Sequence, residues 1–287
     1  MRCKRKNFLK VWFFGYHVGM NIPRLLWIDF YRWTYQQCLE TLQESLEHDM
    51  SKLVVTPNPE MLYEASRDSE LLQVLENADL ALPDWAGIFV GFQIVNSRLP
   101  KWMKYVMMPW YCARAVLHDD WIREKYGERI TGSKLTKDLF EYANKNGISV
   151  TIIDPEVKGN SPGDKAKRAS QEEIVPKLSK KYPGAKIALL ITDTVPGNLP
   201  KHGIILATHG NGRQEKILTE MVKKYPDCWI AIWVGGSIDL LTGFRSPAPW
   251  FFRRFGGEWL YRLYKQPKKH YKRMKKVVSF LLEQITA

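Results

Sequence analysis

Hydrophobic residues along the chain form short runs that alternate with segments of helical spacing. Runs typical of buried strands occupy residues 53–55, 78–82, 148–153, 185–192, 203–207 and 228–234. Between them, apolar residues recur at helical spacing at residues 35–48, 59–65, 71–75, 85–94, 169–178 and 214–224. Strands that alternate with helices predict an α/β fold, with a parallel sheet and helices on both of its faces.

Three segments depart from this alternation. Residues 1–33 form a basic, aromatic leader, and residues 34–244 contain the predicted α/β core. Residues 98–127 interrupt the core with a segment rich in aromatic residues and methionine, and residues 245–287 form a basic, aromatic C-terminal appendage. Residues 154–168 are rich in glycine, proline and charge, which is typical of a loop.

Composition excludes several classes of protein. The chain has 287 residues, of which 45% are hydrophobic and 25% charged, which is ordinary for a globular protein. Its four cysteines are scattered without a CxxC pair, so a zinc ribbon or a disulfide scaffold is disfavoured. No apolar run approaches the ~18–20 residues that cross a bilayer.

Charge is concentrated in the appendage. The chain carries 43 Lys and Arg against 30 Asp and Glu, and eleven of the basic residues lie between residues 245 and 276, opposed only by Glu258. Eight aromatic residues are interleaved with them. This mixture suits nucleic acid or an anionic membrane, whereas a plain solvated helix face has no use for the aromatics. We expect that the appendage can be removed without opening the sheet, because it follows the last strand.

The inserted segment has two interpretations. Its apolar residues run almost continuously, and three basic residues flank them: Lys101, Lys104 and Arg114. It is either a packed element of the core or of a subunit contact, or an interfacial segment at a membrane. The apolar set comprises Trp102, Met103, Tyr105, Val106, Met107, Met108, Trp110, Tyr111 and Trp121.

Polar residues follow the predicted strands where ligands of open parallel sheets bind. Thr56 and Asn58 follow one strand, Asp84 follows another, and the pair Gly235-Gly236 follows the last. A glycine pair permits positive φ and close approach of backbone N–H groups to a phosphate. The chain has no GxGxxG after its first strand and no GxxxxGK[ST], so standard dinucleotide and P-loop sites are disfavoured.

Asp84 itself has two interpretations. Between Pro83 and Trp85 its carboxylate can be partly desolvated, which raises the pKa and suits it to accept a proton. Alternatively, it caps the helix that follows.

Six motifs in one order point to a family. They are Thr56-Pro-Asn-Pro-Glu60, Ala78-Asp-Leu-Ala-Leu-Pro-Asp84, Glu128-Arg-Ile-Thr-Gly132, Gln214-Glu215, Val234-Gly-Gly-Ser-Ile-Asp239 and Glu258-Trp-Leu-Tyr-Arg-Leu263. Together they resemble the WecG/TagA/CpsF glycosyltransferases. The resemblance implies a Rossmann-like core and inverting transfer of an N-acetylmannosamine-type sugar from a UDP-sugar. It also implies a polyprenyl-diphosphate-linked N-acetylglucosamine acceptor, in cell-surface polysaccharide synthesis, and a cytoplasmic enzyme peripheral on the inner face of the membrane.

The resemblance also assigns roles to individual residues. It makes Asp84 the general base, with Thr56 and Asn58 lining the same pocket. The remaining residues are expected to bind the substrates, with Arg262, Lys269 and Lys272 facing a diphosphate. This binding set is Arg129, Gln214, Gly235, Gly236, Asp239, Arg262, Lys269 and Lys272. No cofactor or metal is expected, because the chain has no DxD pair to hold a divalent ion on UDP.

Three departures from the family pattern leave alternatives open. Residues 210–213 read Gly-Asn-Gly-Arg where the family has Gly-x-Pro-Lys, Asp154-Pro155 replaces Gly-Gly, and residues 98–127 replace a short connection. A non-catalytic relative and a basic nucleic-acid-binding α/β protein therefore remain alternatives. The expected partners are a UDP-sugar, the lipid-linked acceptor and an anionic membrane surface, but no nucleic acid. Whether the chain forms a homo-oligomer is left open.

Overall fold

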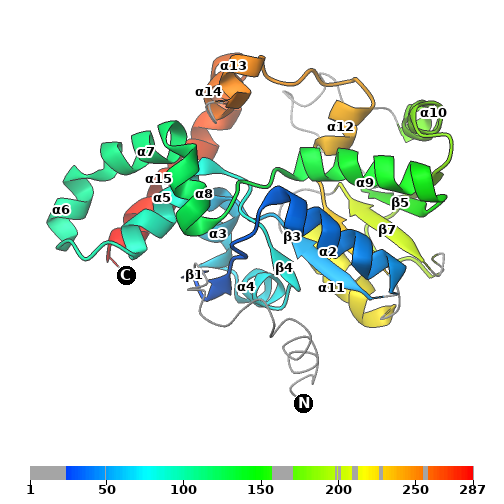
Figure 1. The fold of residues 1–287 in the computed structure, drawn as a ribbon, viewed down its shortest axis with the longest axis horizontal. Coiled ribbons are helices and arrows are strands. Elements are labelled where there is room, and N and C mark those ends of the chain that lie inside the picture. The colour runs from blue at the N-terminus through cyan, green and yellow to red at the C-terminus, as the bar shows by residue number, and fades with distance from the viewer. Residues whose placement is uncertain are drawn as a thin grey trace.

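A parallel sheet forms the centre of the protein (Figure 1). The computed structural model describes residues 24–48, 50–156, 171–197, 199, 202–208, 213–225, 229–254 and 258–286. Six strands in the order β4-β3-β8-β7-β5-β6 make up the sheet, and every neighbouring pair is parallel. The strands are β3 (Lys52–Val55), β4 (Leu80–Ala81), β5 (Ser149–Asp154), β6 (Lys186–Ile191), β7 (Gly203–Ala207) and β8 (Trp229–Trp233). The predicted α/β fold class is confirmed.

Helices cover both faces of the sheet. One face carries α2 (Tyr35–Glu47), α9 (Gly132–Asn146), α10 (Gln171–Lys181) and α12 (Ser237–Leu241). The other carries α3 (Pro59–Ala65), α4 (Ser69–Glu76), α5 (Ala86–Val95), α11 (Arg213–Lys224) and α15 (Pro267–Thr286). Successive side chains of a strand point to opposite faces. In β3, Val54 therefore packs with the first set of helices, whereas Leu53 and Val55 pack with the second.

The segment before the core contributes to packing. Residues 1–23 of the predicted leader lie outside the described residues. The remainder forms a hairpin of β1 (Arg24–Leu25) and β2 (Ile28–Asp29), followed by Phe30, which bridges Ala81 beside the sheet. Phe30 is fully buried, and its ring packs edge-on against Phe92 at 5.3 Å between centroids. The leader is thus partly a structural element of the core.

The inserted segment forms three short helices beside α5: α6 (Lys101–Val106), α7 (Met108–Leu117) and α8 (Asp119–Tyr126). Tyr111 and Ala115 of α7 are buried in the same hydrophobic cluster as α5. The Nε2 of Gln93 donates to the carbonyl oxygen of Tyr111 at 3.1 Å, and the ring of Tyr126 stacks on Phe92. One side of the insert therefore belongs to the core.

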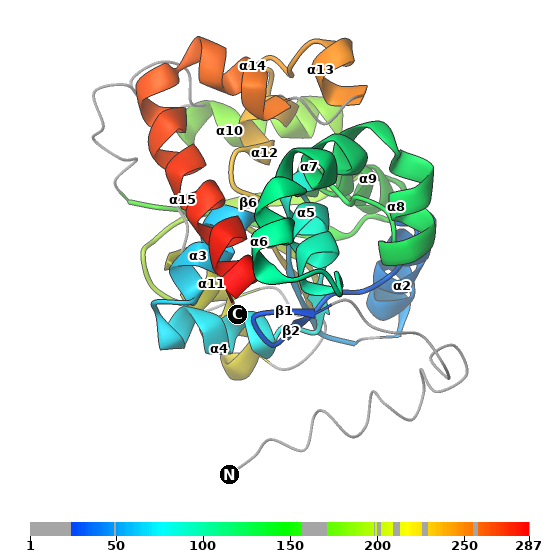
Figure 2. The same cartoon turned by 90° about the vertical axis from the view of Figure 1, so that its left-hand side faces the viewer.

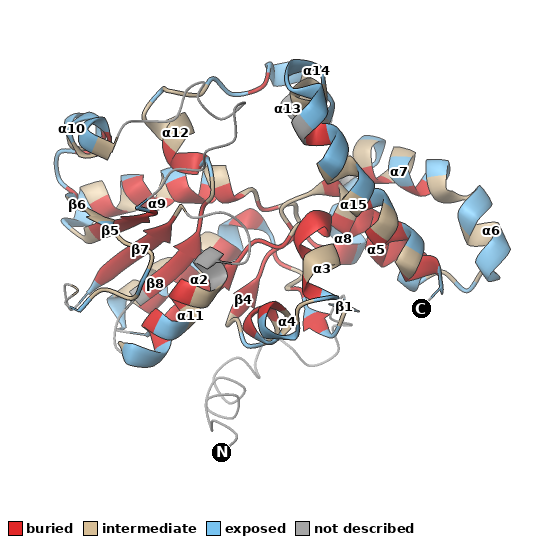
Figure 3. Ribbon diagram, turned by 180° about the vertical axis from the view of Figure 1, so that it is seen from behind, coloured by how far each residue is buried: buried red, intermediate tan, exposed pale blue. Residues whose placement is uncertain are grey.

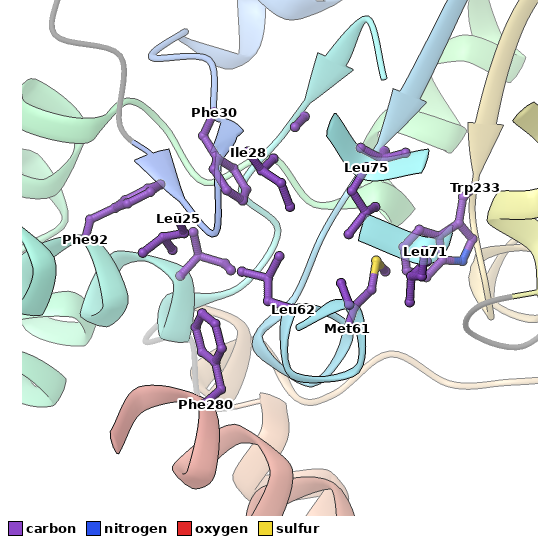
Figure 4. Packing of buried hydrophobic residues seen from close by; sticks show 14 of the residues in the cluster. Leu25, Ile28, Phe30, Met61, Leu62, Leu71, Leu75, Phe92, Trp233 and Phe280 are labelled. Carbon is purple, nitrogen blue, oxygen red and sulfur yellow. The ribbon is translucent and has the colours of Figure 1, made fainter. Parts of the chain in front are cut away.

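The C-terminal appendage contains α13 (Trp250–Arg254), α14 (Glu258–Lys265) and α15. Val277, Phe280, Leu281 and Ile285 of α15 are buried in the cluster that also holds β1, α3 and α5, and Phe280 is fully buried (Figure 4). A Cβ added at Gly91 of α5 would lie 3.7 Å from the Phe280 ring. The helix α15 therefore closes one side of the core, and removing the appendage would uncover that side. Our expectation that the appendage can be removed without opening the sheet stays a prediction.

Ion pairs hold the same helix in place. The Nε of Arg273 lies 2.8 Å from the carboxylate of Glu60, and the Nζ of Lys276 lies 2.6 Å from that of Glu64. Both acids belong to α3, the helix that follows β3. Two of the basic residues in the appendage thus pair with acids of the core helix α3. Among the described residues, no helix is long and apolar enough to cross a bilayer.

Candidate functional site

Asp84 lies just past the end of β4, before α5 begins at Ala86. The N-cap residue of α5 is Trp85, and no side chain accepts a hydrogen bond at that cap. The carboxylate of Asp84 instead accepts a hydrogen bond from the backbone N–H of Gly132, at the first turn of α9. Asp84 therefore does not serve as the helix cap, which was the alternative to a chemical role.

Burial and four neighbours set the ionisation of Asp84. Burial is the largest influence, and it raises the pKa to about 6 because the charged form is poorly solvated. The positive charges of Arg129 and Arg262 and the hydrogen bond from Gly132 lower the pKa, whereas the negative charge of Glu258 raises it. A carboxylate with a pKa near neutrality is suited to accept a proton from a hydroxyl.

The charges around Asp84 come from distant parts of the chain. Arg129 lies in the connection before α9, and Arg262 and Glu258 lie one turn apart on α14. The Nη2 of Arg262 donates to the Oε2 of Glu258 at 3.2 Å. Figure 1 shows α13 and α14 at the top of the molecule, reached through the long connection that follows α12. The appendage thus supplies two of the charges that act on Asp84.

Thr56 and Asn58 follow the adjacent strand β3, which pairs with β4. Thr56 is buried, and a Cβ added at Gly132 would lie 3.5 Å from its Oγ1. Thr56 and Asp84 therefore both lie close to Gly132. That they line one substrate pocket stays a prediction. The Oδ1 of Asn58 accepts a hydrogen bond from the backbone N–H of Met61 at 3.0 Å, and so caps α3. Asn58 has a structural role that sequence reasoning missed, and its place in the substrate pocket stays a prediction.

A second group of predicted residues lies after β8. Gly235 has a φ of +47°, in the left-handed region that favours glycine. At Gly236, an added Cβ would lie 3.1 Å from the guanidinium of Arg245 and 4.0 Å from the Oδ2 of Asp239. The backbone N–H of Arg245 also donates to the carbonyl oxygen of Asp239 at 2.9 Å. The turn therefore brings a backbone bend, an arginine and a carboxylate together at the carboxyl end of the sheet, and Arg245 is an addition to the predicted set.

The three remaining predicted residues are not brought to Asp84 by the described contacts. Gln214 is the second residue of α11, and its side chain lies outside the described residues, as does that of Lys269 on α15. Lys272 is exposed on α15, and it is not among the side chains whose charge shifts the pKa of Asp84. Roles for these three residues stay predictions.

The ends of β5 and β7 hold a polar cluster that the sequence did not single out. Asp154 is buried and accepts hydrogen bonds from the Oγ1 of Thr208 and, at 2.9 Å, from the Nε2 of Gln171. This is the aspartate that replaces glycine in the family pattern, so the departure places a carboxylate at the strand ends. The signal available in the sequence was a polar residue directly after each of two buried strands.

An open apolar pocket of about 520 Å³ lies on the appendage. It is lined by Phe252 of α13 and by Leu260, Tyr261, Leu263 and Tyr264 of α14. Arg262, which acts on Asp84, is on the same helix. The helix α14 therefore carries both apolar pocket residues and an arginine whose charge acts on Asp84.

Comparisons with known proteins place the chain in a family. The sequence model of the "Glycosyl transferase WecG/TagA/CpsF family" matches residues 23–122 and 114–286, two stretches that meet within the inserted segment. Two curated relatives are both named N-acetylglucosaminyldiphosphoundecaprenol N-acetyl-beta-D-mannosaminyltransferase. The protein from Bacillus subtilis (strain 168) is 24% identical over 247 residues, covering 83% of this chain and 80% of its own length. The protein from Bacillus spizizenii (strain ATCC 23059 / NRRL B-14472 / W23) is 23% identical over 246 residues, covering 82% and 79%. The chain thus belongs to the WecG/TagA/CpsF family of glycosyltransferases.

Proposed function

We propose that this glycosyltransferase moves an N-acetylmannosamine-type sugar from UDP to a polyprenyl-diphosphate-linked N-acetylglucosamine, with inversion at the anomeric carbon. The observation that carries the proposal is the partly buried Asp84, whose carboxyl has its pKa raised to about 6, beside Arg129 and Arg262. Support for the substrates comes from the names of the two Bacillus relatives, which match most of the chain.

In the proposed reaction, Asp84 accepts the proton of the acceptor hydroxyl as its oxygen attacks the anomeric carbon of the donor sugar. One carbon–oxygen bond forms, and the bond between the anomeric carbon and the UDP oxygen breaks on the opposite side. The electron pair of the broken bond leaves on the diphosphate of UDP. Thr56 lies close to Gly132, whose backbone N–H donates to Asp84, and this position suits Thr56 to line the acceptor pocket.

Positive charge and backbone N–H groups are suited to stabilise the leaving group. The leaving diphosphate gains negative charge in the transition state, and preorganised donors stabilise it there. The bend at Gly235 and Gly236, with Arg245 beside it, suits that part of the donor, and Asp239 suits a sugar hydroxyl. Arg262 belongs to the appendage and acts on Asp84, which suits the diphosphate of the acceptor.

The acceptor lipid suggests where the reaction takes place. We propose peripheral binding to a membrane, with the apolar pocket on α13 and α14 near the isoprenoid end of the acceptor. Exposed aromatic residues on these helices, Trp250, Phe251 and Tyr264, are of the kind that lie at headgroup depth. The nucleic-acid alternative is weaker, because Arg273 and Lys276 of the basic stretch are paired with acids of α3.

The test is release of UDP from a panel of UDP-N-acetylhexosamines, with and without a polyprenyl-diphosphate-N-acetylglucosamine analogue. We expect release from UDP-N-acetylmannosamine that depends on the acceptor. Asp120→Asn is a matched control for changes at Asp84, because Asp120 is a highly exposed aspartate of α8. Release that is independent of the acceptor, or strongest with another UDP-sugar, contradicts the proposed substrates.

A further inference from the structure

The outer side of α6 and α7 exposes large apolar side chains. Trp102 is 65% exposed, Tyr105 44%, Val106 68% and Trp110 50%. Figure 2 shows these two helices facing the viewer, and Figure 3 shows exposed positions along both. We call the outward side of residues 98–118 the α6–α7 face.

This exposure does not come from poor packing of the insert. Met107 and Met108 pack against the core, and Tyr111 is buried, with its hydroxyl donating to the Oγ of Ser97 at 2.9 Å. The insert therefore has one side that is fully used by the fold. The sequence left core packing and a surface role as alternatives, and the structure divides the aromatic residues between the two.

The α6–α7 face is also purely basic. Residues 98–118 contain Arg98, Lys101, Lys104 and Arg114 and no acidic residue. Arg98 and Lys101 are exposed. Glu283 of the neighbouring α15 is taken up by an ion pair with Arg67. The Nζ of Lys101 donates to the carbonyl oxygen of Thr286, and the guanidinium of Arg114 stacks on Trp121, but neither contact supplies an acidic side chain. Aromatic side chains among such cations match the surface of an anionic bilayer, where rings lie at headgroup depth and cations meet phosphates.

We propose that the α6–α7 face docks on an anionic lipid bilayer. Helices of this length lie along a membrane surface, because a spanning helix needs about 20 residues. A second copy of the chain fits less well, since a two-fold contact would set these cations against their own copies. The chain's first 23 residues fit no better, because they carry basic residues and no acidic ones.

The inference rests on the proposed function in one respect: a lipid-linked acceptor would bring the protein to a bilayer. Docking through α6 and α7 adds to any contact made by α13 and α14, which belong to the appendage. The two matched stretches of the family model overlap at residues 114–122, within this insert.

Vesicle binding without donor or acceptor tests the inference separately from the enzyme activity. Co-sedimentation is measured for the full chain with phosphatidylglycerol-rich vesicles and with pure phosphatidylcholine vesicles. The test variant is Trp102→Ser/Tyr105→Ser/Trp110→Ser. The control is Trp27→Ser/Met50→Ser/Ile191→Ser, which removes exposed apolar side chains elsewhere. A second variant, Arg98→Gln/Lys104→Gln, tests the charge.

We expect the wild-type protein and the control to bind the anionic vesicles, and the aromatic variant to bind at least about tenfold more weakly. The charge variant is expected to bind roughly 30-fold more weakly, at about tenfold per 1.4 kcal/mol and ~1 kcal/mol for each cation. Melting temperatures should stay unchanged, because the substituted side chains are outside the core. UDP release with a water-soluble, short-chain acceptor should also be unchanged.

Several results overturn the inference: no vesicle binding by the wild type, equal binding by the aromatic variant, or a large fall in its melting temperature. Conversion of an oligomer to a monomer by the aromatic variant, seen by sedimentation velocity, shows instead that the face is a subunit contact. If vesicle binding behaves as expected but no donor yields UDP, the proposed function fails while the docking surface stands.

Discussion

Replacing Asp84 by Asn removes an ionisable group while keeping the size of the side chain. The structure predicts opposite effects on activity and on stability. Loss of the proton acceptor should reduce transfer about 10²–10⁴-fold, the usual contribution of a general base. Folding, in contrast, should become more favourable at neutral pH, because the protein no longer buries a poorly solvated carboxylate.

The size of the stability effect follows from the pKa. In the folded protein the pKa of Asp84 rises from 3.8 to about 6. At about 1.4 kcal/mol per pH unit, the ionised carboxylate costs at most about 3 kcal/mol, and less where water screens the partly exposed group. An unpaired polar amide also has a cost, so we expect a net gain in the free energy of unfolding of about 1–2 kcal/mol.

The sign of the pH dependence is fixed by the same shift. Below about pH 4 the carboxyl is protonated in both states, so the wild type and the Asp84→Asn variant should differ little in stability. Between pH 4 and 6 the unfolded chain loses this proton while the folded protein keeps it. The wild type therefore loses stability relative to Asp84→Asn as pH rises through this window, and the full difference is present above the folded pKa.

The assay is urea unfolding of the wild type, Asp84→Asn and the Asp120→Asn control at pH 5 and pH 7.5, beside transfer rates at pH 7.5. We expect an inactive variant whose unfolding midpoint is raised at pH 7.5 and closer to wild type at pH 5. A variant that is less stable than wild type at both pH values would refute the reasoning that the Asp84 carboxylate is poorly solvated. A variant that keeps transfer within a few-fold of wild type would refute its role as the base.

Three further changes test other parts of the account. Glu258→Gln removes the negative charge that raises the pKa of Asp84 and releases Arg262 from its ion pair, so the acidic limb of the kcat/KM profile should move to lower pH; an unmoved limb would separate Asp84 from that ionisation. Phe280→Ala in α15 should lower the free energy of unfolding by about 3–5 kcal/mol, measured by urea unfolding, because Phe280 is fully buried; a loss under about 1 kcal/mol would show that α15 is a detachable appendage. Gly235→Ala should cost roughly 1 kcal/mol in stability, since its φ is +47°, and should raise KM for the donor, measured by initial rates of UDP release; an unchanged KM would place the nucleotide elsewhere.

Local patterns predicted the elements of the core because strand and helix periodicities are properties of neighbouring residues. The same patterns predicted the glycine bend after β8 and placed Asp84 at a strand end. They did not show that Trp85, and not Asp84, is the N-cap residue of α5, because cap geometry depends on backbone angles that the residue types leave open. The hydrogen bond from Gly132 to Asp84 joins two segments far apart in the chain, and no local spacing contains it.

The appendage shows a second reason for failure. Val277, Phe280, Leu281 and Ile285 follow helical spacing, but they lie behind a long basic stretch whose charge dominated the interpretation. The helix that they form, α15, has its apolar side in the core, and two of its basic residues pair with acids of α3. The charge pattern predicts a domain boundary at residue 245, whereas the buried residues of α15 belong to the core.

The most direct test of the central claim is the anomeric configuration of the transferred sugar, determined by NMR of the disaccharide released from the lipid. A single displacement in which Asp84 activates the acceptor hydroxyl predicts a configuration opposite to that of the sugar in the UDP donor. Retention of the donor configuration would contradict the account, because a single displacement from the side opposite the leaving UDP inverts the anomeric carbon.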